Sequence, residues 1–270
     1  MAAQTISRID WENYIRTLRN INEAAAQELI DWIETYGRDE NGVMLRNIME
    51  AVDAYDNDII DEAYLIAEKY GNASAAISAE MYEATAELEG KIIPAAEMAA
   101  NPSYSEVRKT VFGTLKTSTN VDELAGAVSR LVKRTGVDTT MQNALRDGAQ
   151  WAWIPHGETC AFCLTLASRG WQNASKKALK NGHAEHIHAN CDCTYAIRFS
   201  DDVDYEGYNP DKYLKMYHDA PGAKPKDKIN AMRREFYEEN KEAINEQKRS
   251  AYEKRKEREA SSAEEINVST

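Results

Sequence analysis

The residues best suited to chemistry are concentrated in one short window of the sequence. All four cysteines lie in two stretches, "CAFC" from Cys160 to Cys163 and "HIHANCDC" ending at Cys193. Three of the five histidines, His183, His186 and His188, belong to the second stretch or lie just before it. Thiolate and imidazole groups are the preferred ligands of zinc, and a CxxC turn spaces two thiolates for one ion. The residue types therefore predict a metal site.

The preferred ligands are the four cysteines, and His188 either replaces one thiolate or supports the site from the side. His183 and His186 are expected on the surface of the loop. Clustered cysteines in a reducing compartment favour metal ligation over disulfides, although two disulfides or four reduced thiols remain alternatives. The predicted ligand set is Cys160, Cys163, His188, Cys191 and Cys193.

A catalytic role for such a site requires an open coordination position and a nearby acid or base. The HxE at His156 matches one half of the zinc-deaminase signature, but the CxxC follows Glu158 too closely and the downstream pair lacks the proline. A cysteine nucleophile with His188 as its base has no third orienting group. A metal-dependent nuclease remains the enzymatic alternative, because imidazoles are concentrated beside a segment that resembles a strand.

A structural role accounts for more of the window. The polar run 172–190 can bury little apolar surface, so a metal that ties its two ends together would order it. We therefore expect a structural zinc ion and no enzymatic activity.

The elements before this window are predicted to be helices. Apolar residues recur every three or four positions over 7–36, 43–70 and 73–89, with Gly71-Asn72 between the last two. Three such helices joined by short turns indicate an antiparallel bundle over residues 1–100. Pro94 and Pro102 bracket a weakly patterned stretch that we interpret as a domain boundary.

The second predicted unit, residues 101–200, combines helices with the Cys/His window. Shorter helices are expected over 105–116, 120–134 and 138–151, and a strand over 194–199. The sequence thus predicts a small α+β module that resembles a zinc knuckle.

The C-terminal part is predicted to be a tether and a charged helix. Residues 201–225 read as a linker, 226–260 as a helix and 261–270 as a disordered tail. Within the helix, "INAMRREFYEENKEA" and "INEQKRSAYEKRKER" repeat with an offset of 15 residues. Its polar character favours a solvated helix, with contact to DNA or to a sister subunit as the alternatives.

The charge of the chain is unevenly distributed. The net charge is −12, yet residues 1–100 contain 7 Lys and Arg against 20 Asp and Glu and carry −13. Such an acidic half argues against a nucleic-acid surface there, because phosphate contacts need clustered basic residues. No stretch approaches a membrane span of roughly 20 apolar residues, and the start lacks the plan of a secretory signal. We expect synthesis in the cytoplasm.

The stretches "TMQNALRDGAQWAWIPHGETCAFCLTLASRGW" and "HIHANCDCTYAI" resemble the Mu F-like head morphogenesis (minor capsid) proteins of tailed bacteriophages. The resemblance covers roughly Met141 to Arg198. It places the family's CxxC and HxxCxC on the five predicted ligands, with Trp153 before the first pair. Family members commonly carry proline beside the first cysteine and before the second cluster, where this chain has "CAFC" and "HANC".

This resemblance implies a minor virion protein that acts in head assembly, in the capsid interior or near the portal. Its implied partners are portal and capsid proteins, and its C-terminal helix would be available to packaged DNA. We expect no membrane and no small-molecule substrate among them. The sequence as a whole predicts a mainly α protein with an N-terminal bundle, a Cys/His module and a charged C-terminal helix.

Overall fold

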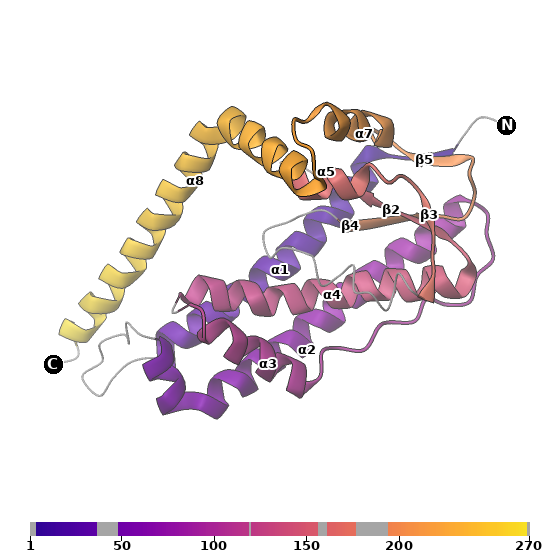
Figure 1. Ribbon diagram of the computed structural model, residues 1–270. Coiled ribbons are helices and arrows are strands. Elements are labelled where there is room, and N and C mark those ends of the chain that lie inside the picture. The colour runs from indigo at the N-terminus through magenta and orange to yellow at the C-terminus, as the bar shows by residue number, and fades with distance from the viewer. Residues whose placement is uncertain (1–3, 37–47, 119, 156–160, 177–193, 269–270) are drawn as a thin grey trace.

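Helices make up most of the chain, as the sequence predicts, and a small antiparallel sheet accompanies them (Figure 1). The computed structural model describes residues 4–36, 48–118, 120–155, 161–176 and 194–268. The first four helices are α1 (Arg8–Tyr36), α2 (Ile48–Leu88), α3 (Tyr104–Leu115) and α4 (Val121–Asp147). They pack against one another and give the molecule its elongated body.

Local sequence signals fix several helix ends. Ser103 and Glu106 form a reciprocal capping box at the start of α3, in which each side chain accepts a hydrogen bond from the other residue's backbone N–H. The Asn120 side chain caps α4 by accepting from the N–H of Asp122. Gly148 ends α4 with a φ of 70°, the left-handed conformation that glycine adopts at little cost.

Two helices continue where the sequence predicts a break. The expected end at Gly71-Asn72 is wrong, because α2 runs unbroken through both residues. The break predicted between the helices over 120–134 and 138–151 is also wrong, because α4 is a single helix that passes through Gly136. Both glycines lie where neighbouring groups approach closely: a Cβ on Gly71 would lie 2.3 Å from Asn101 Oδ1, and one on Gly136 would lie 2.4 Å from Ser74 Oγ. They are therefore packing positions rather than helix ends.

The body contains two large hydrophobic cores. One lies among α1, α2, α3 and α4, and its largest fully buried side chains include Leu29, Ile59, Ile66, Leu124 and Val132. The other joins the start of α1 and the ends of α2 and α4 to the sheet, and it contains Trp11, Tyr82, Met141, Trp151 and Tyr205. Both cores draw residues from either side of residue 100, where the sequence suggests a domain boundary.

The sheet follows α4 directly. Its strands are β2 (Gln150–Ile154), β3 (Gln172–Asn173) and β4 (Thr194–Arg198), in the antiparallel order β3-β2-β4. The predicted strand over 194–199 is thus confirmed. The predicted helix through Trp151 is too long, because Gly148 ends α4 and Trp151 lies in β2.

A second sheet, of two strands, joins the start of the chain to residues that follow the cysteine segments. Strand β1 (Gln4–Ile6) pairs in parallel with β5 (Val203–Tyr205). Residues 201–225, which the sequence suggests are a linker, therefore contain a strand and also α7 (Pro210–Asp219). The alternating burial of β5, with Val203 and Tyr205 inward, anchors this ribbon on the core of the sheet.

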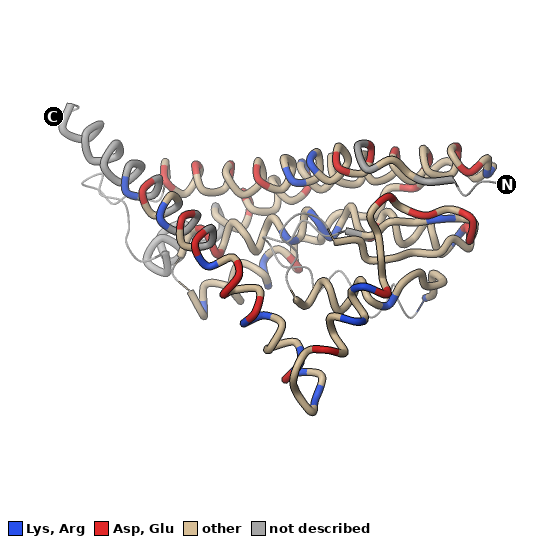
Figure 2. Tube along the Cα trace, turned by 90° about the horizontal axis from the view of Figure 1, so that it is seen from above, with Lys and Arg blue, Asp and Glu red and all other residues tan. Residues whose placement is uncertain are grey.

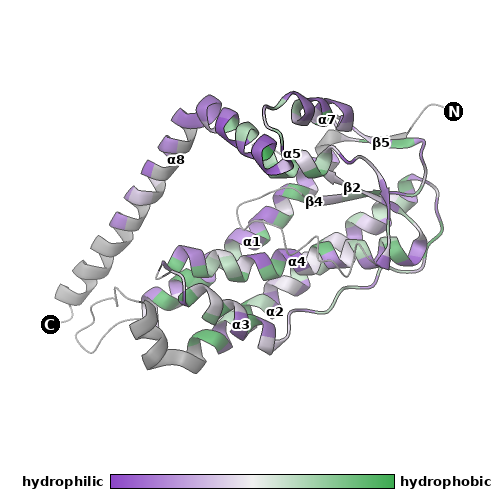
Figure 3. Ribbon diagram, viewed as in Figure 1, coloured by the Kyte–Doolittle hydropathy of each residue, from purple (hydrophilic) through white to green (hydrophobic). Residues whose placement is uncertain are grey.

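The charged C-terminal helix is present and is longer than predicted. Helix α8 runs from Pro225 to Val268, so it includes most of the segment expected to be disordered. Its first turns pack against α7 and α5 (Ala161–Ala167), with Met232 and Ala220 in a small third core. Beyond these turns it leaves the body, and Figure 3 shows the coloured residues of that part as predominantly hydrophilic.

Candidate functional site

The two segments that carry the predicted metal ligands adjoin the same end of the same pair of strands. β2 and β4 are antiparallel, and their pairing ends with Ile154 opposite Thr194. The first segment, 156–160, follows β2 after Pro155, and the second, 177–193, leads into β4 at Thr194. The chain therefore enters or leaves both segments at one edge of the sheet.

Of the five predicted ligands, the structure describes Cys163. It lies on α5 with 2% of its surface exposed, and it belongs to the core that packs on the sheet. Cys160, His188, Cys191 and Cys193 lie outside the described residues, as do His183 and His186. Among the described residues, no group of three or more His, Cys, Asp or Glu side chains is placed to hold a metal ion.

Aromatic side chains fill the space behind this edge. Trp153 pairs across the strands with Tyr195, and the Tyr195 ring stands edge-on to both Trp151 and Trp153 at centroid distances of 4.8 Å. Such T-shaped pairs are favourable beyond the area they bury. They fix β2 against β4 and so hold the edge in place.

Two polar atoms at the edge have no hydrogen-bond partner in the described part of the chain. They are Trp153 Nε1 and the Tyr195 hydroxyl, and both are buried. An unpartnered buried donor costs about 1–3 kcal/mol. Burial also raises the pKa of Tyr195 well above its ordinary value, and the nearby Asp138 carboxylate raises it further. The hydroxyl is therefore protonated and available as a donor.

Asp138, on α4, carries the most perturbed carboxyl group near the sheet. Burial raises its pKa to about 6, and the Glu106 carboxylate adds to the rise. Arg134 opposes the rise, with its Nε 3.8 Å from the Asp138 carboxylate. Because this pKa lies above the value of about 3.9 expected in the unfolded chain, ionisation of Asp138 opposes folding.

We predict that Asp138→Asn stabilises the protein at neutral pH. The cost of charging Asp138 grows as the pH rises from about 4 to about 6 and is full above that. Because the side chain is partly exposed, we expect the free energy of unfolding to rise by about 1 kcal/mol at pH 7.5. This gain should fall to near zero at pH 4. Urea unfolding at both pH values measures it. Asp202→Asn, in an exposed turn, is the control, and a variant less stable than wild type at pH 7.5 would contradict the prediction.

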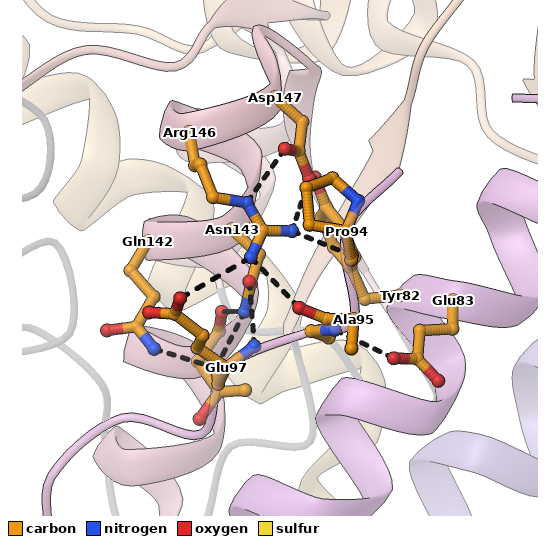
Figure 4. Close-up of polar contacts among 11 residues, drawn as sticks. Tyr82, Glu83, Pro94, Ala95, Glu97, Gln142, Asn143, Arg146 and Asp147 are labelled. Atoms are coloured by element: carbon orange, nitrogen blue, oxygen red, sulfur yellow. Dashed lines mark hydrogen bonds and ion pairs between the residues drawn. The ribbon is translucent and has the colours of Figure 1, made fainter. Parts of the chain in front are cut away.

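An extended segment that the sequence suggests is a boundary is instead held firmly on the helices. We call residues 91–103, which lie between α2 and α3, the strap. Arg146 donates to the carbonyl oxygens of Pro94 and Ala95, each at 3.0 Å, and also binds Asp147 (Figure 4). Asn143 accepts from the N–H of Glu97 and donates to its carbonyl oxygen.

Further side chains complete this arrangement. Gln142 donates to the Glu97 carbonyl, Glu83 accepts from the Ala96 N–H, and Thr139 accepts from the Ala99 N–H. The polar residues of α4 and α2 therefore replace the backbone partners that a strand in a sheet would have. The polar spacing of Thr139, Asn143 and Arg146, along one face of α4, is the sequence signal that could have indicated a bound extended segment.

A hollow at the turn between α7 and α8 was also not foreseen. It is open to solvent, encloses about 780 Å³, and is lined by Pro221, Gly222, Asp227, Asn230, Arg233 and Arg234. Gly222 has a φ of 142°, and a Cβ there would lie 2.7 Å from that of Asp227, so glycine is required for the tight turn. The hollow is thus a consequence of how α8 is joined to α7.

The comparisons with known proteins place most of this architecture in one family. The family model described as VG15 protein matches residues 5–220. The match includes the strap, the sheet, both cysteine segments and α7, and it ends before α8 begins at Pro225. No curated protein and no solved structure matches the chain. Among the described helices, none is both long and apolar enough to cross a membrane.

Proposed function

The chain belongs to the VG15 protein family, a family of phage and viral proteins, and from that premise we propose that it is a minor capsid or head morphogenesis protein of a phage. It acts as a structural or assembly component of the virion head, near the portal or in the capsid interior. It has no enzymatic activity. Its partners are portal and capsid proteins, and α8 is the part available to packaged DNA.

The pairing of β2 with β4 is the observation that carries the proposed structural metal site. Ile154 is opposite Thr194, so the segments with Cys160 and Cys193 both begin or end at that edge. Cys163 lies on α5, which packs on β2. This topology supports the proposal, because the two segments that carry the predicted ligands adjoin the same end of one strand pair although they are about 30 positions apart in the sequence.

The donor set of that region suits zinc. Four thiolates, or three thiolates and the His188 imidazole, match the tetrahedral sulfur and nitrogen sites that hold structural zinc. Cys163 is buried, as expected for a ligand in a closed site without a water position. When bound, the ion would supply cross-linking and charge neutralisation of the thiolates, and Cys160, Cys163, Cys191 and Cys193, with His188, would hold it.

A rigid module of this kind is suited to assembly rather than catalysis. The two orphaned donors at the edge, Trp153 Nε1 and the Tyr195 hydroxyl, need acceptors that the rest of the described chain does not provide. A metal-ordered connection over the edge would supply acceptors while it excludes water. The module then presents a fixed surface to the neighbouring head proteins.

We predict that Cys193→Ser removes bound zinc. Elemental analysis of purified wild-type protein should give about one zinc per chain, and the variant should give close to none, because a serine hydroxyl is a poor replacement for a thiolate. The melting temperature should fall in parallel, and a chelator should lower that of the wild type. His183→Ala is the matched control, since His183 is expected on the loop surface. Equal zinc in wild type and Cys193→Ser would contradict the site.

The virion role is tested separately, with virions purified on a density gradient. Mass spectrometry should find the chain in the particles, and preparations from a phage that lacks the gene should contain defective heads. Detection only in the soluble lysate would contradict a virion component. Metal-dependent nicking of plasmid DNA, lost in His188→Ala, would instead favour the nuclease alternative.

A further inference from the structure

The turn that joins α7 to α8 is a basic part of an acidic protein. We call residues 220–234 the corner. They contain five Lys and Arg against one Asp, a net charge of +4, whereas the whole chain carries −12. Figure 2 shows the corner projecting from the body, with acidic positions recurring along the long helices at the opposite edge of the view. An anionic partner can therefore approach the corner with little repulsion from the acidic part of the chain.

Most of the basic side chains of the corner are available to a partner. Four of the five are exposed and form no ion pair with the described part of the chain, namely Lys224, Lys226, Arg233 and Arg234. The single acid, Asp227, accepts a hydrogen bond from the Lys224 backbone N–H at 3.3 Å, at the start of α8. The corner therefore offers four cations to a molecule outside the described chain.

The fifth basic residue, Lys228, fixes the shape of the corner. Its ammonium group donates to the carbonyl oxygens of His218 and Ala220 at 2.7 and 2.8 Å, and it lies 5.7 Å from the centre of the Tyr217 ring. The buried Met232 packs the same turns of α8 into the small third core. Because the backbone of the corner is held in this way, less ordering is needed when a partner binds.

The exposed basic residues of α8 share one side of the helix. Lys226 precedes Arg233 and Arg234 by seven and eight positions, which is about two helical turns. Lys224 lies directly before the helix, which begins at Pro225. These residues therefore form a continuous basic face at the start of α8.

The glutamates that follow the corner lie on another side of α8. Glu235 and Glu239 come three and seven positions after Met232, so they continue the side of the helix that carries the small third core. Glu238 pairs with Lys241 at 3.4 Å. The basic face thus keeps its charge, although α8 as a whole contains eleven basic and eleven acidic residues.

The hollow at this turn is suited to a phosphate group. Arg233 and Arg234 line it together with Asn230 and Asp227. A guanidinium group can donate two parallel hydrogen bonds to a phosphate, and it stays charged in proteins. The Asn230 amide adds a neutral donor. Two guanidinium groups oppose the one carboxylate of Asp227, so the lining attracts an anion.

The basic face extends beyond the hollow. Lys224 and Lys226 do not line it, and Lys226 lies about 10 Å along the helix from Arg233 at a rise of 1.5 Å per residue. A single small anion in the hollow would leave both lysines without a partner. The phosphates of a nucleic acid repeat along each strand, about every 3.4 Å of helix axis in a duplex. A row of phosphates therefore matches the face better than one small anion does.

We propose that the corner binds the phosphate backbone of nucleic acid. Arg233 and Arg234 hold one phosphate in the hollow, and Lys224 and Lys226 contact its neighbours. Contacts of this kind position a protein on nucleic acid without reading its sequence. The inference rests on the proposed function for DNA as the nucleic acid that is present, and it assigns the contact to the first turns of α8 rather than to the whole helix.

Anisotropy of a fluorescently labelled DNA duplex, titrated with the full-length protein, tests the proposal. Four phosphate contacts should weaken binding by roughly 100-fold between about 50 and 200 mM salt. The double variant Arg233→Gln, Arg234→Gln should bind at least about 10-fold more weakly in low salt, with a salt slope smaller by about 2. Two duplexes of unrelated sequence should bind the wild type equally well.

A matched variant separates the corner from the overall charge of the protein. Lys109→Gln, Lys116→Gln removes the same charge from exposed positions in and beside α3, and it should bind DNA as the wild type does. Lys224→Gln, Lys226→Gln should weaken binding and lower the salt slope as the arginine variant does. Circular dichroism of each variant checks that it remains folded.

Three results would overturn the proposal. One is no binding of DNA by the wild type at micromolar concentrations in low salt. Another is an equal loss of binding in the corner and α3 variants, which would assign it to overall charge. The third is binding of phosphatidylserine vesicles but not of DNA, lost in the arginine variant, which would make a membrane surface the partner.

The search for the chain in virions is a separate test. A chain that is present in virions but does not bind DNA would keep the proposed role and reject the corner as a nucleic-acid site. A chain that binds DNA through the corner but is absent from virions would support the site and contradict the role.

Discussion

Replacing Gly136 by alanine is expected to destabilise the protein by about 1–3 kcal/mol, although alanine is the better helix former. The Cβ of an alanine at this position would lie 2.4 Å from Ser74 Oγ, 2.7 Å from Ser78 Oγ and 3.0 Å from the Ser74 carbonyl oxygen. The serine hydroxyls can rotate, but the backbone oxygen of α2 cannot move without shifting the helix. Both large cores depend on how closely α2 and α4 approach here, so the cost is distributed through the body.

Gly113→Ala is the matched control for this prediction. Gly113 lies inside α3, and a Cβ there meets nothing within 4 Å. Alanine at this position should therefore stabilise the protein by about 0.5–1 kcal/mol through helix propensity alone. Urea unfolding of both variants measures these changes in stability. The midpoint should fall for Gly136→Ala and rise for Gly113→Ala at a constant m-value.

A second substitution separates the clash from other effects. Ser74 Oγ is buried with no hydrogen-bond partner among the described residues, so Ser74→Ala should cost little by itself. In combination with Gly136→Ala it removes the closest contact and should recover part of the lost stability. A Gly136→Ala variant as stable as Gly113→Ala would show that the two helices do not pack as described.

Replacing Arg146 by methionine is expected to cost about 2–3 kcal/mol and to loosen the strap. The guanidinium joins three groups at once: the Pro94 and Ala95 carbonyl oxygens and the Asp147 carboxylate, whose side chain is only 7% exposed. Methionine keeps most of the apolar stem but leaves Asp147 buried without its cation. Tyr82 still donates a hydrogen bond to Asp147 at 2.9 Å, so the Asp147 carboxylate keeps one partner in the variant.

The pH dependence of this effect has a definite sign. The hydrogen bonds from Arg146 lower the pKa of Asp147, and the Tyr82 hydroxyl lowers it further. A lowered carboxyl pKa contributes stability above the unfolded value of about 3.9, and that contribution is lost as the pH falls. The difference in unfolding free energy between wild type and Arg146→Met should therefore become smaller as the pH is lowered.

Hydrogen exchange and a conservative variant distinguish this network from a general loss of stability. The Ala96, Glu97 and Ala99 amides donate to side chains of α2 and α4 and should exchange faster in Arg146→Met at a given global stability. Arg146→Lys should recover only part of the effect, since one ammonium group cannot reproduce the planar fork. Arg16→Met, at an exposed position where the arginine donates to Asn13 on the same helix, should change stability by less than about 0.5 kcal/mol. Unchanged exchange in the strap would contradict the role given to Arg146.

The local patterns of the sequence were sufficient for much of the fold. The spacing of apolar residues identified α1 and α3 to within a residue or two, and the strand predicted over 194–199 is β4, which ends at Arg198. The charged repeat identified α8, although that helix reaches Val268. These features depend on neighbours close in the chain, which is why periodicity, capping residues and composition indicate them.

Predictions from the sequence were wrong where glycines and an irregular segment contact residues that lie far away in the chain. Gly71 and Gly136 resemble helix ends when taken alone, because glycine is common just past a helix. Their actual role depends on Asn101, Ser74 and Ser78, which lie on other segments. In the same way the strap resembles a linker until Arg146 and Asn143 are seen to bind its backbone.

For the candidate site, the sequence by itself determined which residue types lie together: four cysteines and three histidines in one window, the pattern from which a zinc site is predicted. Only the tertiary structure decided that the strands beside both cysteine segments are paired, that Cys163 is buried on α5, and that a parallel ribbon joins Gln4–Ile6 to Val203–Tyr205. The physical reason is the range of the interactions. Ligand type is a property of single residues, whereas strand pairing and the fit of one helix against another depend on groups that the linear order keeps far apart.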